Sequence, residues 1–504
     1  MALGASRGRI VSQLLTESML LASGGGVVGI ALAAAALNGL KRLGMEGFDL
    51  WRPVSLDARV LLMTVLISIA TSIFFGLLPA LSTSRIDIRS VLVEGGRGTP
   101  SPRQRRMRQI LVVGEIALGM VLLASAGLLI RTLAHLRGLD PGFDPYHVLV
   151  AQLSLEDARY KTSASIDSLY QKSLDRIRAL PGVESAAVGL TLPYQRPLNG
   201  GTRILDGTNK SAEYSMTEII PVTPGYFETL RMKVKAGRTF SAPDSATGQQ
   251  VVIINQAFAK KYLRQQSAVG THVGLDATPS EIVGLVADTP QNSGAGNFGP
   301  LSATPTVYVP TAQTGDQGIT MLYTWFSPSW VVRTRGANGN LAGEMQKAIR
   351  AIDPRLPFST FKSMEDLQDS AVVRQRYEAT LFSIFAALAL LLAALGIYGL
   401  VANSVTQRTR EIGIRMVLGA SVREAIASIV TPGVQLAAIG TALGLVLTWF
   451  ASALIRNLIW GVQPHDPLTY IVVTALMFAI AASASVLPAL RLIKLDPAET
   501  LRDN

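Results

Sequence analysis

Six stretches of this chain are long, apolar and almost free of charge, and they limit what it can fold into more than any other feature. Each exceeds the ~20 residues that a helix needs to cross a bilayer core of about 30 Å. Glu115 is the one charged residue inside them. We therefore expect an α-helical membrane protein with six transmembrane helices, at residues 18–40, 60–84, 109–130, 379–407, 425–455 and 467–490.

The interval between the third and fourth stretches has a different character. Its apolar runs are only four to seven residues long, which is typical of a folded domain in water. The segments "ESAAVGLTLP" (184–193) and "WVVRT" (330–334) read as strands. Apolar residues recur at helical spacing in two places: Ile166, Leu169, Tyr170, Leu174 and Ile177, and then Leu341, Met345, Ala348, Ile349 and Ile352. These patterns predict an α+β domain with an insertion of mostly strands and loops at about 200–325.

The net charge of +11 is concentrated in the connections between the apolar stretches. Basic residues of short loops stay in the cytoplasm. With both termini in the cytoplasm of a bacterial inner membrane, six spans place these clusters inside and residues 132–378 in the periplasm. This placement favours a membrane protein over a nucleic-acid-binding one. The basic residues are Arg85, Arg89, Arg97, Arg103, Arg105, Arg106 and Arg108, then Arg408, Arg410, Arg415 and Arg423, and finally Arg491, Lys494 and Arg502.

The beginning of the chain repeats near its end. "MALGAS" (1–6) corresponds to "MVLGAS" (416–421) at an offset of 415 residues, and "LPALSTSRIDIRSVL" (78–92) corresponds to "LPALRLIKLDPAETL" (487–501) at an offset of 409. A repeat this widely spaced indicates a duplicated module rather than a repeat array. We expect the sequence to start inside the first copy.

A charged segment follows the fourth apolar stretch, "QRTREIGIRMVLGAS" (407–421). Glu411 lies three residues after Arg408 and four before Arg415, and each such pair stabilises a helix by about 0.2–0.5 kcal/mol. Gly413 and Gly419 weaken the helix. The residues leave two interpretations open: a charged helix at the membrane surface, or a coupling helix held by a docking partner.

The order of the motifs resembles that of FtsX/MacB-type ABC transporter permeases. "RTREIGIRMVLGAS" and "LPALRLIKLDPAETLR" resemble the permease signature. "GLLIRTL", "DPGFDP", "LPGVESA", "TPGYFETL", "AGRTF" and "VVIINQAFAKKYL" resemble the periplasmic core, in the expected sequence. The repeat resembles permeases in which two such modules are fused in one chain.

The resemblance implies a domain organisation. Residues 1–95 would be the C-terminal part of a first permease module, with two transmembrane helices, followed by a basic cytoplasmic linker at 96–108. A transmembrane helix at 109–131 would lead into a MacB-like periplasmic core domain at 132–378. Residues 379–504 would complete the second module with three transmembrane helices and the coupling helix.

The resemblance also implies a function. A separate cytoplasmic ABC ATPase would dock on the coupling helix, and its motion would drive the periplasmic domain in the efflux or extraction of a hydrophobic or amphipathic substrate. A periplasmic adaptor or an outer-membrane component would be a further partner. The permease module would also pair, either with a second module in a pseudo-dimer or with a copy of the same chain in a homodimer. The docking residues carried over are Arg408, Arg410, Glu411, Gly413, Arg415, Gly419 and Ala420. Only Gly4 and Ala5 survive in the first copy.

Two other functions remain open at this point. An FtsX-like protein would regulate a periplasmic cell-wall hydrolase, and a membrane-anchored sensor would work without an ATPase. The large domain and its MacB-type motifs favour transport over the first, and the coupling segment favours transport over the second.

Small residues mark equivalent helices of the two copies. Gly25 and Gly29 correspond to Gly440 and Gly444, and each pair places glycine on one helix face, where another helix can approach closely. The contact would be within the chain or between the two modules. For Glu115, which is near the inner end of its span, we expect pairing with a neighbouring arginine or a reach to the interface rather than a proton relay.

The sequence contains few motifs that would indicate an enzyme. The G-x-x-x-x-G-K-[ST] phosphate loop does not occur in it, so ATP hydrolysis is expected in a separate partner. "GASRG" (4–8) matches a hydrolase nucleophile motif but lacks the preceding strand that this motif needs. With no cysteine and no clustered His or carboxylate motif, we expect no metal and no cofactor.

Overall fold

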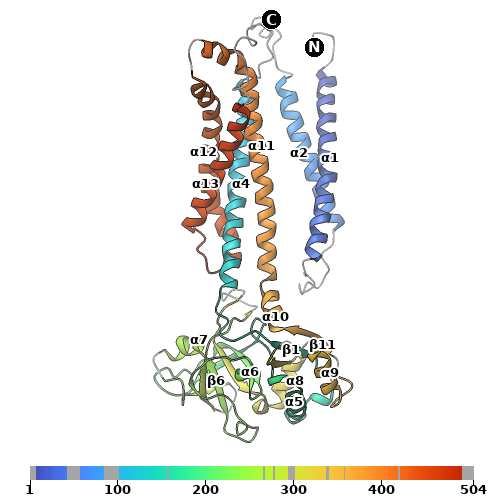
Figure 1. The fold of residues 1–504 in the computed structure, drawn as a ribbon, viewed down its shortest axis with the longest axis vertical. Coiled ribbons are helices and arrows are strands. Elements are labelled where there is room, and N and C mark those ends of the chain that lie inside the picture. The colour runs from blue at the N-terminus through green and yellow to red at the C-terminus, as the bar shows by residue number, and fades with distance from the viewer. Residues whose placement is uncertain are drawn as a thin grey trace. The chain divides into compact units, whose positions relative to one another are not determined.

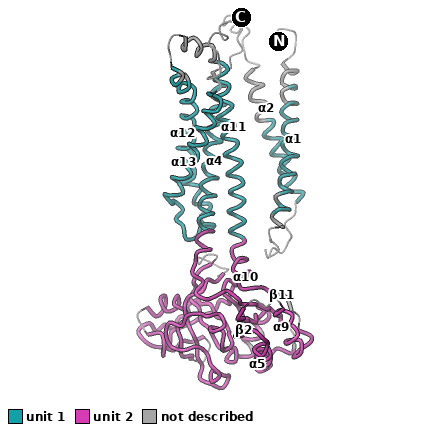
Figure 2. Tube along the Cα trace, viewed as in Figure 1, with its two compact units in different colours: residues 1–132, 374–504 teal, residues 133–373 magenta. Residues whose placement is uncertain are grey.

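The computed structural model describes residues 7–42, 57–83, 102–155, 158–264, 267–275, 279–292, 301–336, 340–356, 358–417 and 421–490. The chain divides into two compact units (Figure 2). The helical unit comprises residues 1–132 and 374–504, and the α+β unit comprises residues 133–373. The predicted segments 1–6, 84–101 and 491–504, which include Gly4 and Ala5, lie outside the described residues.

Long helices form the described part of the helical unit (Figure 1). They are α1 (Arg7–Arg42), α2 (Ala58–Thr83), α4 (Pro102–Arg137), α11 (Val373–Val417), α12 (Val422–Ile455) and α13 (Pro467–Ala489). Helices α1 and α2 contact each other. Helices α4, α11, α12 and α13 share one apolar core, which contains Ile116, Met120, Ile397, Ala437, Val473 and Met477.

Five of these helices are long and apolar enough to cross a membrane in the described part of the chain: Thr16–Gly39, Arg105–Arg137, Val373–Gln407, Ile426–Leu458 and Pro467–Ala489. The remaining predicted span, 60–84, coincides with α2, of which Ala58–Ile73 counts as a shorter apolar helix. The membrane class is thus confirmed, whereas the number of six spans stays a prediction. Helices α1 and α12 begin 415 residues apart, and α2 and α13 begin 409 residues apart, which equal the two offsets of the sequence repeat.

One half of the α+β unit is a four-stranded antiparallel sheet in the order β11-β1-β10-β2. Its elements are β1 (Val148–Leu153), α5 (Ser163–Arg178), β2 (Val183–Gly189), β10 (Ser329–Thr334), α9 (Leu341–Arg350) and β11 (Phe358–Ser363). Helices α5 and α9 cover this sheet beside α8 (Asp316–Trp325) (Figure 1). The fully buried Trp330 lies in this core and donates from Nε1 to Ser173 Oγ at 2.8 Å.

The other half is a ring of six strands inserted between β2 and β10. Its strands are β3 (Leu198–Ile204), β4 (Ser215–Val222), β6 (Val251–Asn255), β7 (His272–Gly274), β8 (Pro279–Val286) and β9 (Thr306–Pro310). They pair in the order β4-β3-β7-β8-β6-β9, and parallel pairing of β9 with β4 closes the ring. Val252, Ile254, Ile282 and Val307 belong to its apolar core. Strand β5 (Val234–Gly237) pairs with β8, and the short helices α6 (Tyr226–Thr229) and α7 (Gln256–Phe258) lie in the connections.

The α+β class predicted from the sequence is therefore confirmed. The two predicted helices are α5 and α9, the strand-like segments form β2 and β10, and the insertion at about 200–325 is mostly strands and loops. Two further elements complete the unit before α11, namely β11 and the helix α10 (Met364–Ala371), which a capping box of Ser363 and Asp366 begins. The helix α8 was not predicted.

Glu218 on β4 is a buried carboxyl group inside the α+β unit. It is 7% exposed, and the amide nitrogen of Asn199 on β3, in the orientation that donates, lies 2.8 Å and 3.3 Å from its two oxygens. Burial raises the pKa of Glu218 from 4.5 to about 7, and the charge of Arg196 opposes this rise. The folded state therefore holds this proton more tightly than the unfolded state does.

We expect the stability of the α+β unit to fall as the pH rises from about 4.5 to about 7, because the folded protein must then ionise a buried group. In the wild type, we expect the free energy of unfolding to fall by about 1–3 kcal/mol over this pH range because of Glu218. The substitution Glu218→Gln should remove this fall. Thermal unfolding of the full chain at a series of pH values measures the slope. Glu213→Gln, at an exposed position, is the control. An unchanged slope in Glu218→Gln would contradict the assignment.

Candidate functional site

Most of the predicted coupling segment forms the C-terminal end of a single long helix. Helix α11 runs for 45 residues from the end of the α+β unit, through the fourth apolar stretch, and on to Val417. Arg408, Arg410, Glu411, Gly413 and Arg415 lie in its last turns, although their side chains are not described. Gly419 and Ala420 lie outside the described residues.

Helix α12 begins at Val422, five residues after α11 ends at Val417. A capping box starts it: Glu424 N donates to Ser421 Oγ at 3.3 Å, and Ser421 N donates to Glu424 Oε2 at 3.0 Å. Such reciprocal bonds satisfy two of the four free N–H groups at a helix start. The connection between α11 and α12 is therefore a short one with a defined end.

The predicted glycine face of α12 lies against α4. A Cβ atom added to Gly440 would be 2.7 Å from Ile116 Cβ, and one added to Gly444 would be 2.5 Å from Met120 Cβ. The backbones of the two helices approach closely because neither glycine has a side chain. At Gly25 and Gly29 of α1, an added Cβ would meet nothing within 4 Å among the described atoms. The equivalent positions of the repeat therefore differ in what covers them.

Glu115 of α4 lies within this helical core. Its carboxylate is close to Gly396 of α11, where an added Cβ would be 2.7 Å from Oε2. This oxygen is buried and has no hydrogen-bond partner among the described residues. The expected arginine partner for Oε2 is thus not found in the part of the chain that the structure describes.

A polar network joins α4 to the start of α13. Asp466 caps α13 and accepts from Thr469 N at 2.8 Å and from Thr469 Oγ1 at 2.7 Å, and its Oδ2 also pairs with Arg131 of α4. These interactions, led by the bond from Thr469, lower the pKa of Asp466. In the same α12–α13 connection, Trp460 N donates to Thr132 Oγ1 at 3.3 Å. The carboxylate therefore stays charged and keeps α4 and α13 together.

In the α+β unit, a buried arginine holds the segment that follows α4. Arg333 of β10 is 1% exposed. Its guanidinium donates to the carbonyl oxygens of Asp144, Tyr146 and Thr229 at 2.6–2.8 Å, and Nη1 lies 3.2 Å from Asp144 Oδ2. One side chain thus connects the segment after α4, strand β10 and helix α6.

Sequence reasoning missed both polar networks. "DPLT" (466–469) did carry a signal, because Asp before Pro at the first helical position is typical of a helix start. Arg333 gave no such signal within "WVVRT", since its partners lie about 100 to 190 residues away in the chain.

Comparison with known proteins assigns both parts of this architecture. Residues 113–352 match the MacB-like periplasmic core domain, and residues 383–497 match the C-terminal domain of FtsX-like permeases. The chain belongs to the FtsX/MacB-like ABC transporter permease family. It is therefore a membrane protein of the permease type, with a periplasmic α+β domain.

Individual relatives show how far this similarity extends. The ABC transporter permease YvrN of Bacillus subtilis is 27% identical over 352 residues, which are 67% of this chain and 80% of YvrN. The macrolide export ATP-binding/permease protein MacB 2 of Aeromonas hydrophila is 26% identical over 348 residues, 67% of this chain but 50% of that protein. The periplasmic region of MacB from Actinobacillus actinomycetemcomitans is 13% identical, with a TM-score of 0.31, over 45% of this chain and 94% of that structure.

Proposed function

We propose that this chain couples a separate cytoplasmic ABC ATPase to movement of its periplasmic domain, for efflux or extraction of a hydrophobic or amphipathic substrate. In this proposal the ATPase docks on Arg408, Arg410, Glu411, Gly413, Arg415, Gly419 and Ala420, and both termini lie in the cytoplasm. A second module, a homodimer partner or a periplasmic adaptor would complete the assembly.

The continuity of α11 is the observation that carries the proposal. At about 1.5 Å per residue, its 45 residues extend roughly 67 Å, which is more than twice a ~30 Å bilayer core. One unbroken element can therefore join the coupling segment on one side of the membrane to the periplasmic domain on the other. A displacement of its cytoplasmic end would reach the periplasmic domain without passing through a loop.

Packing within the helical unit supports the same role. The glycine face of α12 lies on α4, and α4 is the other helix that leads into the α+β unit. Arg131 and Asp466 join α4 to α13. Because α12 starts directly after the coupling segment, movement there would act on α4 as well as on α11.

The names of the relatives indicate the partner and the substrate class. MacB proteins are named as macrolide export proteins that contain ATP-binding and permease functions together. This chain spans about half the length of those relatives, and its sequence does not contain the phosphate loop of an ATPase. In this proposal an ABC ATPase partner supplies ATP hydrolysis.

Reversing the charge of Glu411 tests the docking segment. We expect the tagged wild-type chain to co-purify an ABC ATPase, identified by its peptide masses, and Glu411→Arg to reduce the recovered ATPase at least tenfold. The substitution replaces one acidic group by a basic one between Arg408 and Arg415. The control is Glu213→Arg in the α+β unit, which should leave recovery unchanged. If the wild-type chain recovers no ATPase, or the variant recovers as much as the wild type, the proposal fails.

A further inference from the structure

We propose that a cavity at the side of the six-stranded ring binds the apolar part of an uncharged amphiphilic molecule. This inference rests on the proposed function, since it places the substrate class of that function at named residues. The cavity has a volume of about 780 Å³. This is within the roughly 300–1,000 Å³ typical of small-molecule sites, which are often found at the mouths of β-barrels.

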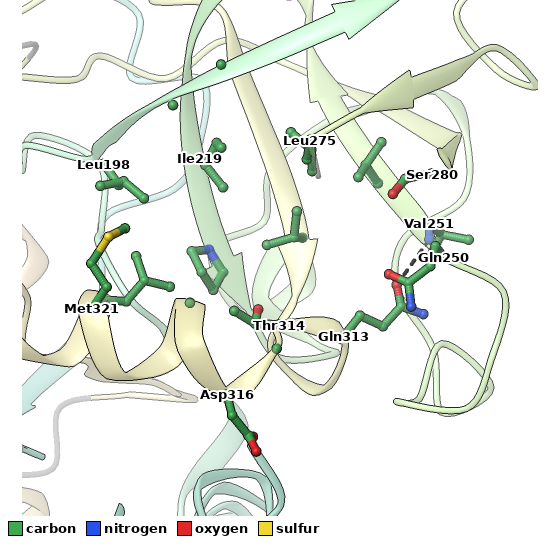
Figure 3. Close-up of a pocket in the computed structure, with 18 of the residues that line it drawn as sticks. Leu198, Ile219, Gln250, Val251, Leu275, Ser280, Gln313, Thr314, Asp316 and Met321 are labelled. Atoms are coloured by element: carbon green, nitrogen blue, oxygen red, sulfur yellow. Dashed lines mark hydrogen bonds between the residues drawn. The ribbon is translucent and has the colours of Figure 1, made fainter. Parts of the chain in front are cut away.

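Apolar side chains from the ring and from α8 line opposite walls of the cavity (Figure 3). The lining residues of this type include Leu198, Ile219, Val252, Leu275, Met321 and Leu322. Strand β3 contributes two successive glycines here, so its backbone reaches the surface of the cavity. An alkyl chain or ring system would lose contact with water on both sides.

The polar groups of the cavity are almost all neutral. Asn199, Gln250, Ser280 and Thr314 line it, and the one charged residue among its described lining residues is Asp316, whose Oδ1 accepts from Ser163 N at 2.7 Å. Without a lysine or arginine among these residues, an anionic ligand would lose its hydration with no compensating charge. The lining therefore disfavours an anionic head group, and its mostly neutral polar side chains suit groups that only donate or accept hydrogen bonds, such as a sugar or an amide.

The wall of the cavity next to β6 is held in place before any ligand binds. Gln313 accepts from Val251 N at 3.0 Å through Oε1, and its Nε2 donates to the carbonyl oxygens of Ser245 and Gln249 at 3.2 Å and 2.8 Å. These bonds fix the loop between β9 and α8. A preformed wall lowers the entropy that binding would otherwise cost.

Helix α8 exposes two large apolar side chains, one of which lines the cavity. Met321, which lines the cavity, is 52% exposed, and Trp325 one turn later on α8 is 79% exposed. Residues four apart lie on the same helix face. Methionine adapts its shape to different ligands, and tryptophan offers a large apolar surface. Met321 thus presents apolar surface at the cavity, and Trp325 extends this surface along the same face of α8.

Photo-crosslinking tests this site in the full chain reconstituted in phosphatidylcholine nanodiscs. In one arm, the probe is a dodecyl maltoside analogue with a diazirine in its alkyl chain. In the other, it is an uncharged glycosyl diacylglycerol with a diazirine in an acyl chain. We expect adducts on the peptides that contain Ile219 and Met321, with at least fivefold lower yield when unlabelled dodecyl maltoside competes. Adducts from the first probe identify a free amphiphile as the source, and adducts from the second identify a membrane lipid.

Two variants and a matched control separate the cavity from general exposure. Met321→Lys should lower the adduct yield at least fivefold, and Thr314→Trp should do the same by filling the cavity. Met216→Lys changes an exposed methionine that is not among the lining residues and should have no effect. Thermal unfolding identifies any variant that fails to fold. Adducts confined to the membrane helices, or an equal yield in Met321→Lys and Met216→Lys, would overturn the inference.

Crosslinking needs no ATPase, so the two proposals fail separately. A chain that recovers an ABC ATPase but gives no adducts at the cavity contradicts the binding site alone. A chain that gives the adducts but recovers no ATPase contradicts the coupling function and leaves an amphiphile-binding domain.

Discussion

Replacing Gly444 with leucine will disrupt the packing of α12 on α4. A Cβ at this position already falls 2.5 Å from Met120 Cβ and 3.1 Å from Ala117 Cα, and the remaining leucine atoms have no room. Overpacking of this kind costs about 1–3 kcal/mol, and more where backbone atoms must move apart. We expect a clear loss of thermal stability in detergent and a smaller monodisperse fraction in size-exclusion chromatography.

The repeat supplies a matched control for this experiment. Gly29 occupies the equivalent position of α1, and an added Cβ there meets nothing within 4 Å among the described atoms. Gly29→Leu should therefore cause no loss of stability, because leucine meets no described atom there and is a better helix former than glycine by up to about 1 kcal/mol. Equal losses in the two variants would contradict the role given to the contact with α4, because both substitutions gain the same helix propensity.

Arg333→Met will destabilise the α+β unit strongly. The variant removes the donors to the carbonyl oxygens of Asp144, Tyr146 and Thr229, of which the Thr229 oxygen is buried. Leaving a buried carbonyl oxygen without its donor costs about 1–3 kcal/mol. Hydrogen–deuterium exchange should show faster exchange of the β1 and β10 amides, and the unfolding midpoint of the unit should fall.

A second arginine near the same carboxylate provides the comparison. Arg231 lies 2.9 Å from Asp144 Oδ2 and 3.0 Å from Glu184 Oε1, but its side chain is 52% exposed. Water replaces most of what such an ion pair contributes. Arg231→Met should therefore leave the exchange of β1 and β10 close to that of the wild type. A loss as large as that of Arg333→Met would contradict the role given to burial.

The elements that the sequence predicted well are those whose signal is local. Long apolar stretches marked the membrane helices, and apolar residues at helical spacing marked α5 and α9, because each pattern is complete within its own segment. For the same reason, the repeat located Gly440 and Gly444 on one helix face. Which helix covers that face could not be read from the sequence, since Ile116 and Met120 lie more than 300 residues away.

The helix α8 shows where local signals fail. "DQGITMLYTW" contains a glycine and several β-branched and aromatic residues, all weak helix formers. It is helical because Ile319, Leu322 and Tyr323 pack into the core formed with α5, and the hydroxyl groups of Tyr323 and Tyr170 lie 2.6 Å apart. Tertiary contacts overrode the local preference. The cavity was missed for the same reason, because its walls come from segments that only the fold brings together.

Because α11 is unbroken, it can transmit rotation from one of its ends to the other. Sharp bends in helices occur almost always at proline, at glycine–serine pairs or at bulges. The 45-residue sequence of α11 contains no proline. Every turn is tied to the next by backbone hydrogen bonds, so a twist applied at one end must reappear at the other with little angular loss. The helix can thus transmit rotation about its axis as well as displacement along it.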